Sequence, residues 1–146
     1  MIITSSVFEH MKDIPSKYTC QGENINPPLC ISGVPLDAES LVLIVDDPDA
    51  PKKPWTHWTV WNIDPKTALI PENSIPENSI QGITDSGKPG YGGPCPPAGT
   101  HRYFFRIFAL NSKLNLSSDT PKDKLISIIS NQIIDKAELV GLYAKS

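Results

Sequence analysis

Residues 41–48 read LVLIVDDP, and this stretch decides the class of fold. Five apolar residues, with Val42 and Val45 β-branched, run without interruption and stop at Asp46, Asp47 and Pro48. A short apolar run that ends in turn-forming residues is typical of a β-strand buried on both faces. The sequence therefore predicts a central strand over 41–45, with Asp47 just beyond its end.

Two further stretches have the composition of central strands. Residues 55–63 (WTHWTVWNI) and 101–110 (HRYFFRIFAL) are rich in aromatic and β-branched side chains. Strict alternation predicts that one face of the 55–63 strand holds Trp55, His57, Thr59, Trp61 and Ile63. Its other face then holds Trp58 and Val60. In the 101–110 strand, His101 and Tyr103 share a face with Phe105 and Ile107.

The 15 prolines limit where helices can form, because proline is disfavoured inside a helix and 14 of the 15 precede residue 98. A helix is predicted after Pro121, with Thr120 as its cap and with apolar residues at helical spacing, namely Leu125, Ile126, Ile129 and Ile133. Residues 138–144 are expected to form a closing strand. We therefore expect one mainly β domain over residues 1–146.

Charge and cysteine content exclude several classes of protein. The net charge is −3, without a basic stripe, which argues against a nucleic-acid partner. No apolar run is long enough to cross a bilayer and no signal peptide is evident, so a cytoplasmic protein is expected. Cys20, Cys30 and Cys95 are accordingly expected as three reduced thiols, with a Cys20–Cys30 bridge as the alternative.

Polar side chains at the strand ends suggest a ligand pocket. Asp47, His57, His101 and Tyr103 could meet beside the loop 87–99 (GKPGYGGPCPPAG), whose composition favours a shaped rim at the end of a strand over a mobile linker. Histidine, tyrosine and backbone N–H groups are donors, a set that favours an anion such as phosphate. Two alternatives remain, which are two separate core histidines or a metal site made of both histidines and Asp47.

The opposite face of the 101–110 strand carries Arg102 and Arg106. Arginines on so apolar a strand are usually paired, and Asp49 or Asp46 could supply the carboxylate. We interpret the pairing, with Asp49 and Arg102 as its main members, as structural and not catalytic.

Three segments, DPDAP (47–51), Trp55-x-His57 and GPCPPAGTHRY (93–103), resemble the signatures of the phosphatidylethanolamine-binding protein family, especially its bacterial and archaeal branch. The resemblance runs from about Ile3 to Tyr143. It implies a large antiparallel sheet packed on a smaller one, with a helix in the C-terminal region and short peripheral helices. It also implies a small anion pocket for phosphate or phosphoethanolamine, lined by Asp47, Trp55, His57, Gly93, Pro94, His101 and Tyr103.

The same resemblance implies a non-enzymatic binding protein that uses no cofactor and no metal and that modulates a partner kinase or protease. A homodimer is also expected. Two other functions are kept open. One is a serine protease inhibitor that acts through an exposed loop, such as the tandem PENSI repeat at 71–80. The other is a hydrolase or lyase that uses His57 and Asp47 as an acid/base pair.

Overall fold

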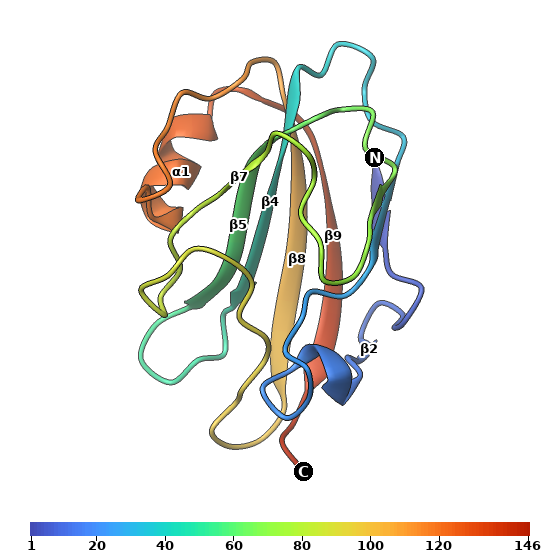
Figure 1. Ribbon diagram of the computed structural model, residues 1–146, viewed down its shortest axis with the longest axis vertical. Coiled ribbons are helices and arrows are strands. Elements are labelled where there is room, and N and C mark those ends of the chain that lie inside the picture. The colour runs from blue at the N-terminus through green and yellow to red at the C-terminus, as the bar shows by residue number, and fades with distance from the viewer.

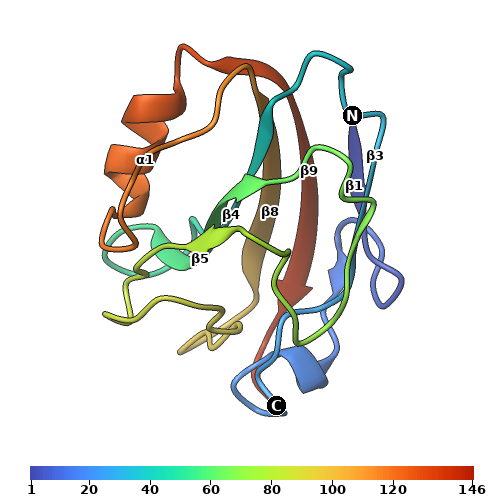
Figure 2. The same cartoon turned by 45° about the horizontal axis from the view of Figure 1, so that its top comes forward.

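The computed structural model describes residues 1–146 as two sheets and one helix (Figures 1 and 2). The larger sheet has the order β2-β9-β8-β4-β5-β7 and the smaller has the order β1-β3-β6. The strands are β1 (Ile2–Thr4), β2 (Lys12–Asp13), β3 (Leu29–Ser32), β4 (Ser40–Asp47), β5 (Trp55–Ile63), β6 (Leu69–Ile70), β7 (Ile80–Gln81), β8 (His101–Leu110) and β9 (Ile133–Tyr143). The helix α1 spans Lys122–Ile129, and a short 3₁₀ helix spans Ser16–Tyr18. The predicted mainly β fold of two packed sheets is confirmed, although β2 pairs with β9 in parallel.

The central strand β4 is buried along all eight residues, as its apolar composition predicts. Leu43 and Val45 face the small sheet and belong to the larger core cluster. Val42 and Ile44 face α1 and belong to a second cluster under the helix. In Figure 2 the helix and the small sheet lie on opposite sides of the large sheet. The double burial of β4 therefore fixes the middle layer of the molecule.

The C-terminal region differs from the prediction in its boundaries. The helix ends at Ile129, and Ile133 begins β9 instead of extending the helix. Pro121 occupies the cap position and no side chain caps the helix, so Thr120 does not have the predicted role. Strand β9 is longer than predicted because it pairs with β8 from Ile133 to Tyr143. No helix in the structure has the length and apolar character needed to cross a bilayer.

The strict alternation predicted for β5 is wrong, because its pairing with β4 slips. Val45 lies opposite Trp58 and Asp46 lies opposite Thr56, which leaves His57 as an extra residue. A bulge of this kind turns a side chain toward the other face of the sheet. His57 consequently faces the same side as Trp58, and its ring packs edge-on against Tyr103 at 5.3 Å between centroids.

A second slip lies at the far end of β5, where Asn62 adopts a φ of 57°. Asparagine tolerates this left-handed conformation better than most residues do. The slip places Ile63 in the core cluster between the sheets, whereas Trp61 packs under α1. The predicted common face of Trp61 and Ile63 is therefore also wrong.

The expectation of three reduced thiols is wrong as well. Cys20 and Cys95 form a disulfide across 75 residues, and only Cys30 is free. The loop that follows the 3₁₀ helix packs against the Gly/Pro loop, where the Cys20 N–H donates to the Pro94 carbonyl at 3.1 Å. The pairing depends on this contact between distant loops, so neither cysteine count nor spacing could reveal it. The alternative bridge from Cys20 to Cys30 does not form.

Removing the disulfide tests how much the contact between these loops contributes to stability. The double variant Cys20→Ser/Cys95→Ser is expected to lose about 4 kcal/mol of unfolding free energy, since a cross-link over such a loop restricts the unfolded chain. Urea unfolding, followed by tryptophan fluorescence, measures the loss. Cys30→Ser is the control and should change stability much less. Equal urea midpoints for the oxidised wild type and the double variant would contradict the assignment of a Cys20–Cys95 disulfide.

Candidate functional site

A pocket of about 500 Å³ lies where β4 ends and β5 and β8 begin. These strand ends lie at the lower end of the large sheet in Figure 1. Of the seven residues predicted to line a ligand pocket, six do so: Asp47, Trp55, His57, Gly93, His101 and Tyr103. Pro94 is buried behind the wall, where its carbonyl accepts the Cys20 N–H. The pocket also has lining residues that the sequence interpretation missed, including Cys20, Cys95, Asn24, Thr84 and Ser86.

The best-defined contact in the pocket joins β4 to β8. Nδ1 of His101 donates to Oδ2 of Asp47 at 2.6 Å, and both residues are buried. The other carboxylate oxygen, Oδ1, accepts the backbone N–H of Asp49 at 2.8 Å. Asp47 therefore fixes the orientation of the His101 ring. Nε2 of His101 makes no hydrogen bond within the chain and is available to a ligand.

Tyr103 lies beside this pair on β8 with 1% of its surface exposed. Its hydroxyl makes no hydrogen bond of good geometry within the chain, although the Asp47 carboxylate and the Cys95 backbone lie close to it. Burial, followed by the nearby charge of Asp47, raises the pKa of Tyr103, so that the hydroxyl keeps its proton. Buried polar groups in native proteins are nearly always paired. A hydroxyl left unpaired at a pocket wall is therefore a place where a ligand can supply the missing partner.

His57 is held from its other side by the Gly/Pro loop. The carbonyl of Gly92 lies 2.7 Å from Nδ1 of His57, so this nitrogen carries the proton and donates it. Burial lowers the pKa of His57, although the hydrogen bond to Gly92 and the charge of Asp47 oppose the shift. The ring is consequently neutral at pH 7, and its Nε2 carries a lone pair.

The Gly/Pro loop is packed in place as a pocket rim. The Gly93 N–H donates to Oδ1 of Asn24 at 2.8 Å. A Cβ on Gly93 would lie 2.4 Å from the Tyr18 carbonyl oxygen, so only glycine fits here. The disulfide fastens the next part of the loop, and Trp55 stands 41% exposed at the mouth.

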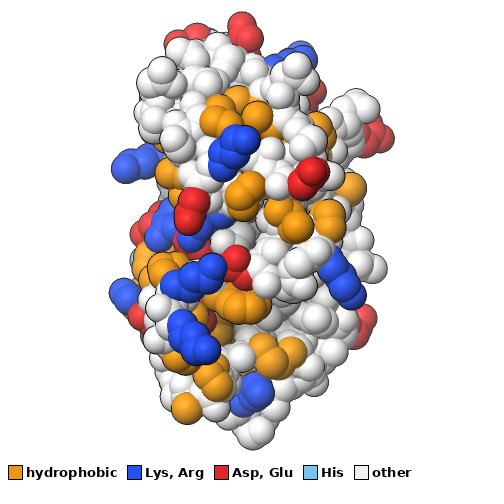
Figure 3. Space-filling model, turned by 90° about the vertical axis from the view of Figure 1, so that its left-hand side faces the viewer, with side chains coloured by type: hydrophobic (Ala, Val, Ile, Leu, Met, Phe, Trp, Pro, Cys, Tyr) orange, Lys and Arg blue, Asp and Glu red, His pale blue; other side chains and the backbone are white.

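The arginines of β8 lie outside the pocket, on the opposite face of the strand. Arg102 pairs with Asp49 through two side-chain hydrogen bonds of 2.9 Å each, which lower the pKa of Asp49 to about 2. Arg106 pairs with Asp46 at 2.9 Å. Both carboxylates named from the sequence thus have an arginine partner. On the side of α1, Figure 3 shows basic side chains interspersed with acidic and apolar ones.

The hydrogen bonds of His57 and His101 at Nδ1 leave Nε2 of both rings free. No group of three His, Cys, Asp or Glu side chains in the structure is arranged to hold a metal ion.

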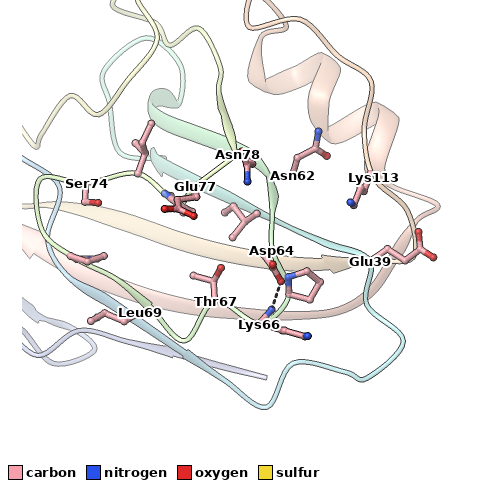
Figure 4. A pocket seen from close by; sticks show the side chains of 15 residues that line it. Glu39, Asn62, Asp64, Lys66, Thr67, Leu69, Ser74, Glu77, Asn78 and Lys113 are labelled. Atoms are coloured by element: carbon pink, nitrogen blue, oxygen red, sulfur yellow. Dashed lines mark hydrogen bonds between the residues drawn. The ribbon is translucent and has the colours of Figure 1, made fainter.

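A second hollow, of about 650 Å³, lies at the opposite ends of β4 and β5 (Figure 4). It includes part of the PENSI repeat and side chains of both charges, such as Glu77, Asp64 and Lys113. The only hydrogen bond drawn there joins the Lys66 backbone N–H to Oδ1 of Asp64. None of the predicted site residues contributes to this hollow, and it contains no histidine or cysteine. The pocket at His101 is the better candidate for chemistry.

The state of His57 can be measured directly. Long-range ¹H–¹⁵N spectra at pH 7 are expected to show His57 as the neutral Nδ1–H tautomer that titrates below the ordinary histidine pKa. Because the folded pKa is lowered, the unfolded chain binds the proton first, and stability falls as the pH drops below about 6.5. A spectrum with the proton on Nε2, or an imidazolium at pH 7, would contradict this assignment.

Comparison with known proteins places the chain in a family. A family model described as phosphatidylethanolamine-binding protein matches residues 4–144. A UPF0098 protein of Methanothermobacter thermautotrophicus is 47% identical, over 99% of both chains. The crystal structure of a putative phosphatidylethanolamine-binding protein homologue from Chlamydia trachomatis is 41% identical, with a TM-score of 0.95 over 99% of this chain and 97% of that one.

The structure of Escherichia coli YbcL, described as a member of the mammalian family, has 31% identity and a TM-score of 0.93, over 99% and 98% of the two chains. Both solved structures share the arrangement of sheets described above. Because the family model covers nearly the whole chain, this protein belongs to the phosphatidylethanolamine-binding protein family.

Proposed function

We propose that the protein binds a small phosphate-type anion in the pocket at the end of β4. The observation that carries this proposal is the unpaired hydroxyl of Tyr103, which is buried beside the His101–Asp47 pair. An unpaired buried hydroxyl costs about 1–3 kcal/mol, a cost that a ligand oxygen would remove. The adjacent His101 lies on the same wall with its Nε2 free of hydrogen bonds within the chain.

The His101–Asp47 pair suits an anion for an electrostatic reason. Asp47 holds Nδ1 of His101, so a ring that also has a proton on Nε2 would be a charged donor aimed at the anion. A hydrogen bond from a charged donor is about twice as strong as one between neutral groups. With a volume of about 500 Å³ the pocket also has room for a headgroup larger than phosphate, and the partly exposed Trp55 at its mouth could contact an ammonium group.

Catalysis by a His57–Asp47 pair receives less support from the geometry. His57 donates to the Gly92 carbonyl and Asp47 accepts from His101, so the two are not hydrogen-bonded to each other. Ser86 lines the pocket, but its hydroxyl is hydrogen-bonded to Thr84 and has no base beside it. A binding function is therefore the better proposal for this set of residues.

The proposal extends to a regulatory role, in which the ligand-bound protein modulates a partner kinase or protease, and to a homodimer. The resemblance to the family supports this part. The expected cytoplasmic location rests on the sequence alone, and the Cys20–Cys95 disulfide argues against it. Inhibition of a serine protease through an exposed loop is the alternative, and the PENSI repeat would be its binding segment. In the structure this repeat forms two turns in which Asn73 and Asn78 each have a positive φ.

Calorimetry with inorganic phosphate and with phosphoethanolamine tests the binding proposal. His101→Ala removes a hydrogen-bonding group from the pocket wall and is expected to weaken the binding of both ligands by roughly 10- to 100-fold. His10→Ala, which removes a histidine on the surface, is the control and should bind as the wild type does. Equal heats of binding from the wild type and His101→Ala would show that the anion does not bind in this pocket.

The unpaired hydroxyl of Tyr103 predicts opposite effects on binding and on stability. Tyr103→Phe should weaken phosphate binding several-fold, because the pocket loses a hydrogen-bond donor. Its unfolding free energy should stay equal or rise, because the substitution removes an unsatisfied buried group. Calorimetry and urea unfolding on the same preparation provide the two readouts. A marked loss of stability in Tyr103→Phe would mean that the hydroxyl is satisfied within the fold.

A further inference from the structure

The pattern of donors and acceptors in the pocket points to a more specific ligand class. We infer that His57 acts as a hydrogen-bond acceptor toward the ligand, so that the pocket selects an oxyanion that carries a proton over one that carries none. Hydrogen phosphate and a singly ionised phosphate monoester carry such a proton, whereas sulfate does not. This inference rests on the proposed function and names the form of anion that the same site takes.

The acceptor role of His57 follows from where its proton is held. Nδ1 lies 2.7 Å from the Gly92 carbonyl oxygen, which can only accept, so the ring proton stays on Nδ1. Nε2 makes no hydrogen bond within the chain. The ring cannot easily turn to exchange the two nitrogens, because the bulge, the Gly92 carbonyl and the edge-on contact with Tyr103 hold it.

Burial of His57 opposes a second proton on its ring, whereas the nearby charges favour one. Carboxylates of Asp47, Asp46 and Asp85 favour a charged ring, but the loss of water around it is the larger effect. Tyr103 keeps its proton, and His101 on β8 also faces the pocket. His57 thus presents a lone pair to the ligand.

His101 and Tyr103 complete the pattern from β8. Tyr103 offers its hydroxyl hydrogen to the ligand, and Nε2 of His101 offers a second hydrogen when that ring holds both protons. Sulfate satisfies both donors but leaves Nε2 of His57 facing an oxygen lone pair. A site built around such a polar group discriminates strongly against a ligand that leaves the group unpaired. A P–OH group donates to Nε2 and satisfies all three groups.

Calorimetry with three anions on the wild-type protein tests the selection. At pH 7.5 inorganic phosphate keeps at least one proton, sulfate has none, and methyl phosphate is mostly without one because its second pKa is near 6. We expect phosphate to bind about 10-fold or more tightly than sulfate, with methyl phosphate close to sulfate. At pH 5.5 the ratio of methyl phosphate to sulfate affinity should rise several-fold, because the ester then carries a proton.

Comparing His57→Gln with the control His10→Gln tests whether His57 causes the preference for phosphate over sulfate. A glutamine at 57 can turn its amide NH₂ toward the ligand, so the phosphate-to-sulfate ratio should fall toward one, whereas His10→Gln should keep the wild-type ratio. Equal affinities for phosphate and sulfate in the wild type would overturn the inference and leave the anion site standing. An unchanged ratio in folded His57→Gln would overturn the role of His57. No binding of any of the three anions would refute the proposed function as well.

Discussion

Every part of the site is placed relative to β4, a strand whose eight residues are all buried. Because its neighbours cover both faces, successive side chains must satisfy two different environments. The strand ends in two carboxylates that continue this alternation. Asp47 points to the pocket and holds His101, while Asp46 points to the helix side and meets Arg106 and Lys122. Double burial of one strand thus separates a ligand site from a structural ion-pair network.

The bulge in β5 brings His57 into the pocket, which regular strand pairing would not do. Without it, His57 would face the α1 side of the sheet, together with Thr59 and Trp61. The extra residue turns the imidazole into the pocket, where the Gly92 carbonyl determines which nitrogen is free. The close packing of Gly93 against Tyr18 and the Cys20–Cys95 disulfide keep that carbonyl in place. A ligand would therefore meet a pocket whose hydrogen-bonding pattern is already set.

Much of this arrangement can be predicted from the sequence. The central strands can be located because runs such as 41–45 and 101–110 are long and strongly apolar, and strict alternation correctly brings His101 to the face of Tyr103. The face of Thr59, Trp61 and Ile63 cannot be found in this way, since a bulge is set by pairing between strands and no local composition marks it. The disulfide is hidden for a related reason, because it depends on two loops that meet only in the folded chain.

The central claim is that one oxyanion sits among His101, Tyr103 and His57. A crystal structure of the protein soaked in phosphate at pH 7.5 tests it most directly. We predict tetrahedral density within hydrogen-bond distance of His101 Nε2, the Tyr103 hydroxyl and His57 Nε2 at once. An empty pocket, or phosphate bound only elsewhere, for example in the hollow at Asp64, would contradict the account.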